Sequence, residues 1–440
     1  MSKETKSYVN QILVLTVPII IENILQTLLG TVDTYFAGQL NDDSIAAIGV
    51  TSLIMNMILA FYMAVSVGVT STVSRSVGEK DVDKANEIVR QSILVSLFLG
   101  LILGVIAYIF RYQILSISGA EDQILRTAIP YYQVVAVPSV LVCLTLVLSA
   151  SLRASKDTVT PMLATGISNV INIILNFVFM KMGYGVVGLA FATTISRGIT
   201  VLILFVRLLT RKDGIHLHLN KFRINRKMCC SILKIGIPAG VEKFMMRFGQ
   251  LVYNGIIISM GTSYYVAHQV GGTIEAYSYI PAFGFSAAAA TLVGISMGEK
   301  NTIKAEKIVK ITYILSIMVM IPIGVIFFLG APALAAMFTQ TKEVQAIVVV
   351  VLRIVAFFQP AIALAQVFAG ALQGAGDTKT PMYSTFIGTW IIHIGLGYVL
   401  GVIFGWKLTG IWIAYVLNNL IRGIFLLFTF KKGKWKQIMI

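Results

Sequence analysis

The hexapeptide Asp-Thr-Val-Thr-Pro-Met at residues 157–162 returns, with one change, as Asp-Thr-Lys-Thr-Pro-Met at residues 377–382. The two copies lie 220 residues apart, and the same offset superposes Gly78-Glu79-Lys80 on Gly298-Glu299-Lys300. Late in each half the offset slips to 222. Chance similarity between hydrophobic helices would not hold polar, proline and glycine positions in one register. The chain is therefore a duplication of one structural unit.

The composition of both halves is that of a membrane protein. Of the 440 residues, 57% are hydrophobic and only 12% are charged, against roughly 25% charged residues in a soluble domain. The mean hydropathy is +0.84. Because 19 acidic and 35 basic side chains cannot cover a soluble fold of this length, we expect an all-α integral membrane protein in contact with the lipid bilayer.

The apolar segments fall into two equal sets. A bilayer core of about 30 Å needs about 20 apolar residues per helix. Twelve segments satisfy this requirement: residues 10–38, 44–74, 91–110, 124–150, 160–182, 187–206, 229–258, 263–296, 311–330, 344–370, 380–402 and 408–430. Six spans per half make the halves parallel repeats, with a central cleft between them as the expected binding site. We therefore predict two six-helix lobes, residues 1–210 and 228–440, joined by a basic cytoplasmic linker at 211–227.

The distribution of basic residues predicts the orientation in the membrane. The net charge of +16 would suggest nucleic-acid binding in a soluble chain. Here the loops on the N-terminal side of the membrane hold 24 lysines and arginines, and the opposite loops hold five. Because basic residues accumulate in cytoplasmic loops, we expect both termini in the cytoplasm and no nucleic-acid partner.

The reactive residue types form no catalytic or metal-binding pattern. Cys143, Cys229 and Cys230 give neither a zinc spacing nor a disulfide framework. The four histidines include no HExxH pair, and the chain has no GxxxxGK[ST] nucleotide loop. We therefore expect no enzymatic activity, no ATP-driven transport and no cofactor beyond a coupling ion.

The strongest candidate site is an acid in the first span. An ionisable group in hydrocarbon costs from about 3 kcal/mol upward, so it marks a functional hypothesis. Asp33 lies about 8 Å from the outer end of its span, and Asn172 and Asn176 lie roughly 15 and 9 Å from the outer end of theirs. With nearby hydroxyls (Thr34, Thr193, Thr194 and Ser196) this set could bind Na⁺; without a cation, burial would favour the protonated acid. The alternative is that Asp33 only caps or hydrogen-bonds a helix end.

A second group of residues is predicted to line a substrate cavity. Glu275 lies about 18 Å from the outer end of its span, and Tyr35, Tyr277 and Tyr279 are aromatic residues of the spans. Acids and aromatic rings suit flat cationic compounds through cation–π contacts. A structural hydrogen bond is the alternative role for Glu275.

The remaining polar residues of the spans favour structural roles. Pro18 and Glu22 repeat as Pro238 and Glu242, which indicates helix packing or a hinge rather than a cavity. Arg197 lies near mid-depth, where it must be paired or hydrated, and a structural pairing with an acid is the favoured interpretation. His268 and His393 are expected to be interior histidines with satisfied hydrogen bonds.

Several motifs resemble those of the multidrug and toxic compound extrusion (MATE) family, its bacterial cation-coupled branch above all. They are Gly30-Thr-Val-Asp-Thr-Tyr-Phe-Ala-Gly38, Ile235-Gly-Ile-Pro-Ala-Gly-Val-Glu242 and Gly374-Ala-Gly-Asp-Thr-Lys-Thr-Pro381. One departure is Ala154-Ser155-Lys156-Asp157, where the family usually carries a glycine-rich version. The resemblance implies a coupling acid at Asp33 and a polar pair at Asn172 and Asn176; some members carry an acid at the second of these positions.

Together these features favour a secondary antiporter that exports organic, cationic xenobiotic compounds in exchange for Na⁺ or H⁺ by alternating access. Because one chain already contains both lobes, we expect a monomer. The alternative is a lipid-linked precursor flippase, which would need a strongly cationic cavity. The few bases in or at the edges of the spans argue against it: Arg197, Lys243, Arg247, Arg353 and Arg422.

Overall fold

The computed structural model is built from helices, with no strand among the described residues, which are 3–118, 122–211, 214–217 and 224–438. The helices of the first half are α1 (Lys3–Gly38), α2 (Asp42–Gly78), α3 (Val82–Ile109), α4 (Arg111–Ile117), α5 (Asp122–Ala136), α6 (Val140–Ala154), α7 (Val159–Lys181) and α8 (Gly185–Thr210). Those of the second half are α9 (Arg226–Ser259), α10 (Thr262–Gly298), α11 (Thr302–Phe338), α12 (Lys342–Phe357), α13 (Gln359–Ala375), α14 (Lys379–Phe386), two π-helical segments, η2 (Ile387–Leu396) and η3 (Val399–Ile403), α15 (Lys407–Lys432) and the 3₁₀ helix η4 (Lys434–Gln437). Residues 212–213 and 218–223 of the expected linker lie outside the described residues.

The chain divides into two compact units. One, here the N-terminal unit, is Val17–Gly240; the other, the C-terminal unit, is Met1–Thr16 with Val241–Ile440. Helices α1 and α9 therefore each contribute to both units. The predicted lobe boundaries, 210/211 and 227/228, stay a prediction.

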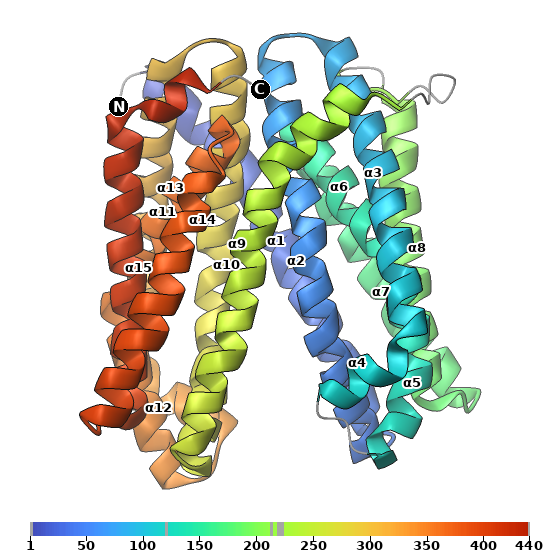
Figure 1. Cartoon of the computed structure of the whole chain (residues 1–440), viewed down its shortest axis with the longest axis vertical. Helices are drawn as coiled ribbons and strands as arrows, with labels where there is room; N and C mark the ends of the chain where they lie inside the picture. The colour runs from blue at the N-terminus through green and yellow to red at the C-terminus, as the bar shows by residue number, and fades with distance from the viewer. Residues whose placement is uncertain (1–2, 119–121, 212–213, 218–223, 439–440) are drawn as a thin grey trace. The chain divides into compact units, whose positions relative to one another are not determined.

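Each unit is organised around one central helix, and the two central helices correspond in the repeat. In the N-terminal unit α6 contacts α2, α3 and α8, while α7 packs on α8 (Figure 1). In the C-terminal unit α13 contacts α10, α11 and α15. Helices α10, α11 and α15 are the repeat counterparts of α2, α3 and α8, so the duplication seen in the sequence extends to the packing of these helices.

The helices account for every predicted span, but two of the spans are broken. Nine helices in the described residues are long and apolar enough to cross a membrane, and two bent pairs raise the number to eleven. The expected continuous spans 124–150 and 344–370 are instead α5 with α6, bent by 41°, and α12 with α13, bent by 56°. The twelfth expected span, residues 229–258, is helix α9. Its six charged residues exclude it from the helices counted as apolar enough to cross a membrane.

A proline accounts for each break. Pro138 lies between α5 and α6, and Pro360 lies at the start of α13. Proline removes a backbone donor and clashes with the preceding helical turn, so it ends or bends a helix there. The two prolines are 222 residues apart, two more than the offset of 220 that holds at residues 78–80 before them and at residues 157–162 after them.

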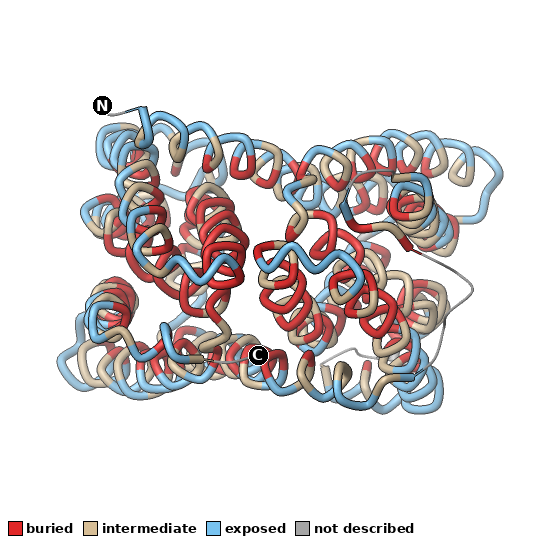
Figure 2. The backbone as a smooth tube through the Cα atoms, turned by 90° about the horizontal axis from the view of Figure 1, so that it is seen from above, coloured by how far each residue is buried: buried red, intermediate tan, exposed pale blue. Residues whose placement is uncertain are grey.

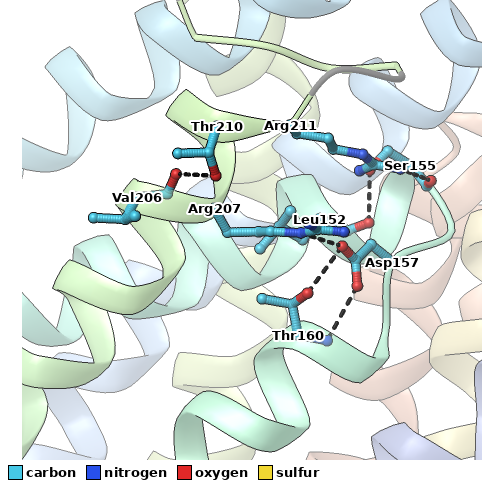
Figure 3. A network of polar contacts seen from close by, with 8 residues as sticks. All are labelled: Leu152, Ser155, Asp157, Thr160, Val206, Arg207, Thr210 and Arg211. Atoms are coloured by element: carbon cyan, nitrogen blue, oxygen red, sulfur yellow. Dashed lines mark hydrogen bonds and ion pairs between the residues drawn. The ribbon is translucent and has the colours of Figure 1, made fainter.

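The repeated hexapeptide forms a helix start in both halves. Asp157 accepts hydrogen bonds from the Thr160 backbone N–H (3.1 Å) and hydroxyl (2.9 Å) at the start of α7, and Arg207 of α8 pairs with it at 3.3 Å (Figure 3). Asp377 makes the same two contacts with Thr380, at 3.0 and 2.7 Å. A side-chain oxygen that satisfies a free N–H in the first turn stabilises a helix start, which explains why this motif is repeated.

The distribution of apolar residues agrees with a lipid environment. Within each unit, buried residues line the inner faces of the helices and exposed residues cover the outer faces (Figure 2). The exposed residues include many large apolar side chains, such as Phe98 and Leu101 on α3 and Leu329 on α11. A water-facing surface would not carry so many of them.

Candidate functional site

A closed ring of hydrogen bonds surrounds Asp33 in the N-terminal unit. The Thr193 hydroxyl donates to Asp33 Oδ2 over 2.7 Å, and Asn176 Nδ2 donates to Asp33 Oδ1 over 3.0 Å. Asn176 Nδ2 also reaches Asn172 Oδ1 at 3.0 Å, and Asn172 Nδ2 completes the ring on Thr193 Oγ1 at 3.3 Å. The carboxylate and the two amides predicted to lie at one level are therefore in direct contact.

Three helices position this ring. Asn172 and Asn176 are one turn apart on α7, so they share a face. The connection to α8 is short, with Gly183 at φ +77°, so α7 and α8 form a hairpin that places Thr193 opposite the two amides. Asp33 comes from α1, and only 5% of its surface is exposed.

The ring has the chemistry of a site for a small hard cation. Asn172 and Asn176 are fully buried, and Asn176 Oδ1 has no hydrogen-bond partner among the described residues. One carboxylate, two amide oxygens and a hydroxyl are ligands that suit a hard cation. In the part of the chain that the structure describes, no three His, Cys, Asp or Glu side chains gather as a metal-ion group.

Arg197 is a charged residue on the same helix as Thr193 of the ring. It lies on α8 one turn after Thr193. It makes no ion pair within 4.0 Å among the described residues, and its Nη1 atom is buried without a hydrogen-bond partner there. The expected structural pairing with an acid is therefore not formed.

The predicted cavity residues are divided between the units and differ in exposure. Tyr35 (α1, N-terminal unit) and Tyr277 (α10, C-terminal unit) are exposed. Glu275, buried on α10, accepts a 2.7 Å hydrogen bond from the Tyr415 hydroxyl, and Tyr279, one turn further on, contacts Gln366. A role for these four residues in binding substrate stays a prediction.

The predicted structural glutamates are both buried in salt bridges. Glu22 accepts from Arg153 Nη1 with both oxygens, at 3.0 and 2.9 Å. Glu242 pairs with Arg422 at 2.9 Å. The prolines beside them, Pro18 and Pro238, lie inside α1 and α9, which continue through them.

Sequence reasoning missed both partners. The predicted spans 124–150 and 160–182 place Arg153 in the loop between them, yet it lies in the last turn of α6 and reaches α1. A signal was present in the repeat: Glu22 and Arg153 are 131 residues apart, as are Glu242 and Gln373, which donates to Glu242 over 2.9 Å. In the second half the contact at this spacing is therefore kept by the neutral Gln373, and the positive charge beside Glu242 comes from Arg422 on α15.

The predicted interior histidines lie in an aromatic cluster of the C-terminal unit. The ring of Tyr253 is 4.5 Å from His393 and 5.6 Å from His268, between centroids. His393 also contacts Tyr415, at 5.3 Å. His268 Nδ1 has no hydrogen-bond partner among the described residues, so packing rather than hydrogen bonding holds this ring.

Comparison with known proteins identifies relatives over nearly the whole chain. The MatE family model matches residues 18–178 and again 238–399, two matches that begin 220 residues apart. A probable multidrug resistance protein NorM of Thermotoga maritima is 30% identical over 97% of this chain and 93% of its own length. The uncharacterized transporter YisQ of Bacillus subtilis is 27% identical over 96% and 94%. A solved multidrug resistance MATE family transporter in an outward-facing conformation shares the fold with a TM-score of 0.91, at 24% identity over 97% and 96% of the two chains.

Proposed function

Since the chain belongs to the MATE family of multidrug efflux transporters, we propose that it is a secondary antiporter of the cytoplasmic membrane. It exports organic cations in exchange for Na⁺ or H⁺, with both termini in the cytoplasm, as a monomer. Asp33 is the coupling acid, and Asn172, Asn176 and Thr193 complete the cation site. The single observation that carries this proposal is the closed ring of these four side chains inside the N-terminal unit.

The coupling follows from the charge of the ring. An ionised carboxylate held only by neutral donors attracts a cation, and either Na⁺ or a proton neutralises it. Cation and substrate then favour opposite arrangements of the two lobes, which alternate access to the two sides of the membrane. Because binding of one disfavours binding of the other, the two fluxes are linked.

The paired arginines support this function over the flippase. Arg422, one of the bases that a cationic cavity would use, pairs with the buried Glu242, and Arg153 pairs with the buried Glu22. The charge of each arginine is neutralised by a glutamate of the same unit. They are therefore poorly suited to hold a polyanionic lipid precursor.

Efflux of a fluorescent cationic dye from everted vesicles tests the proposal, with Na⁺ and pH gradients imposed separately. We expect dye movement under at least one gradient, and we expect Asp33→Asn to abolish it at normal expression. Asp81→Asn is the matched control, because Asp81 accepts from the Lys84 backbone N–H at the start of α3 and asparagine caps a helix equally well. Dye movement under neither gradient would favour the flippase, and full drug resistance with Asp33→Asn would exclude Asp33 as the coupling acid.

A further inference from the structure

Glu275 is a buried acid of the C-terminal unit that has no basic partner among the described residues. The buried glutamates Glu22 and Glu242 each pair with an arginine at 2.9 Å. Glu275, on α10, makes no ion pair within 4.0 Å in the part of the chain that the structure describes. Its carboxylate accepts a hydrogen bond from the neutral Tyr415 hydroxyl, at 2.7 Å. Because an uncompensated charge inside a membrane is costly, this acid is a candidate for binding a cationic ligand.

The partner of this carboxylate belongs to the aromatic cluster of the same unit. The ring of Tyr415 packs on Trp412 and His393, with centroids 5.4 and 5.3 Å away. Tyr253 extends the cluster from His393, at 4.5 Å, to His268, at 5.6 Å. The rings therefore come from α9, α10, η2 and α15, all within the C-terminal unit.

Two ring nitrogens of the cluster are enclosed by protein without a hydrogen-bond partner among the described residues. They are His268 Nδ1 and Trp412 Nε1. Only 4% of Trp412 is exposed, and its indole lies against α10 at Gly271, where a Cβ would be 3.6 Å from Cζ2. Buried polar atoms without partners are rare in folded proteins and call for an explanation. A ligand that enters the cluster supplies one.

Open space adjoins the cluster at Gly272. His268, Gly272 and Glu275 are spaced by four and three residues on α10, so they lie on one face of the helix. A Cβ at Gly272 would meet no atom within 4 Å. Tyr253, His268 and Tyr415 are each partly exposed. The carboxylate and the rings therefore have room beside them for a ligand.

We propose that Glu275 and the aromatic cluster bind the organic cation that the protein exports. The proposal rests on the function proposed above and assigns the substrate cation to the C-terminal unit. The groups around each acid determine which cation it suits. Asp33 contacts amide and hydroxyl groups, whose oxygens suit a small hard cation. The faces of tyrosine and tryptophan instead attract organic cations such as quaternary ammonium groups, and Glu275 neutralises the bound charge.

Binding of tritiated tetraphenylphosphonium to the purified full-length protein in nanodiscs tests this site, with binding to protein-free nanodiscs subtracted. We expect Glu275→Gln to weaken binding at least about tenfold, because unit charges about 5–10 Å apart at an effective dielectric constant of about 20 interact that strongly. Tyr253→Leu should weaken binding about threefold to about thirtyfold, the range of one cation–π contact, whereas Tyr253→Phe keeps the ring and should restore binding to within about threefold of the wild type. Tetraphenylborate, an anion of the same shape, should not bind above the protein-free level.

Further variants separate the site from the fold. Gly272→Leu fills the open space and should remove most of the binding without lowering the unfolding midpoint. Glu343→Gln is the matched control. It removes an exposed acid of α12 in the same unit, which accepts a hydrogen bond from the Ser263 hydroxyl at 3.3 Å, and should bind tetraphenylphosphonium like the wild type. Glu275→Gln should also bind ²²Na⁺ normally, because the Asp33 ring lies in the N-terminal unit.

The outcomes are distinguishable from failure of the proposed function. The site is wrong if the wild type shows no saturable binding, or if Glu275→Gln and Tyr253→Leu both bind tetraphenylphosphonium like the wild type. If Glu275→Gln does not fold, Tyr253→Leu and Gly272→Leu decide in the same way. Loss of ²²Na⁺ binding with normal tetraphenylphosphonium binding in Glu275→Gln would assign a small cation to this acid and overturn the proposal. Failure of the proposed function is measured separately, as the absence of dye movement in wild-type everted vesicles under either gradient.

Discussion

Removing Arg422 should destabilise the C-terminal unit severely, because it leaves Glu242 charged and buried. Glu242 has no exposed surface, and 5% of Arg422 is exposed. The carboxylate accepts hydrogen bonds from Arg422 (2.9 Å), Thr385 (3.0 Å) and Gln373 (2.9 Å). In Arg422→Met two neutral donors remain, and neither can neutralise the charge.

The magnitude follows from the burial of both partners. Breaking a buried ion pair by removing one side costs about 3–5 kcal/mol, because the remaining charge is uncompensated. Adding Glu242→Gln removes that charge. A glutamine at this position can still accept from Thr385, so we expect the double variant to recover about half of the loss, about 2 kcal/mol.

Unfolding in detergent, followed by tryptophan fluorescence, measures these differences. The expected order of stability is wild type, then Glu242→Gln with Arg422→Met, then Arg422→Met alone. Arg207→Met is the control. Arg207 pairs with Asp157, and 47% of the arginine side chain is exposed. Ion pairs at the surface contribute less than about 1 kcal/mol to stability. The reasoning is refuted if the double variant is no more stable than Arg422→Met.

Two further predictions concern the ring and the helix packing. Thr193→Val removes the hydroxyl that donates to Asp33 and should weaken Na⁺ binding about tenfold, the effect of about 1.4 kcal/mol. Thr194→Val, whose hydroxyl donates instead to the Val134 carbonyl, should bind ²²Na⁺ normally, and equal losses would disprove the assignment. Gly370→Ala should cost about 1–3 kcal/mol, because its new Cβ would lie 2.3 Å from the Ser286 carbonyl oxygen, whereas Gly272→Ala, with nothing within 4 Å, should leave the unfolding midpoint unchanged or raise it slightly.

The helical fold is largely predictable from sequence, whereas the positions of the breaks are not. Hydropathy and the repeat predict twelve spans; helices of the described residues lie at all these positions, and eleven of them are apolar enough to cross a membrane when each bent pair is taken as one span. Proline content does not tell which spans bend, because Pro18, Pro238 and Pro281 lie inside unbroken helices while Pro138 and Pro360 break theirs. Neighbouring helices can satisfy the backbone groups that a proline frees in a membrane, so the outcome depends on tertiary packing.

The candidate site is predictable to the level of helix faces. Spacing alone pairs Asn172 with Asn176, and depth alone brings both level with Asp33. Choosing among the hydroxyls requires the rotation of each helix: Thr193 reaches Asp33, while Thr34 turns back to the Gly30 carbonyl. Spacing and depth also do not predict the contacts of long side chains, since Arg153 reaches across to α1 from the end of its helix.

The repeat does not extend to the side chains of the Asp33 ring. At the offsets of 220 and 222, Asp33 corresponds to Tyr253 and Thr193 to Tyr415. The counterparts of Asn172 and Asn176 are apolar, Ile392 and Leu396. In the C-terminal unit two of these counterparts, Tyr253 and Tyr415, belong to the aromatic cluster around His393.

That cluster marks a difference between the two halves. Tyr253 and Tyr415 both pack on His393. Their ring centroids lie 4.5 Å and 5.3 Å, respectively, from that of His393. The carboxylate in this cluster, Glu275, comes from α10. The repeat counterpart of α10 is α2, which contributes no residue to the Asp33 ring. The residues that set helix starts kept their counterparts, as Asp157 and Asp377 demonstrate, because both halves must fold in the same way. The ring itself lies in the N-terminal unit, so under the proposed mechanism coupling depends on that unit.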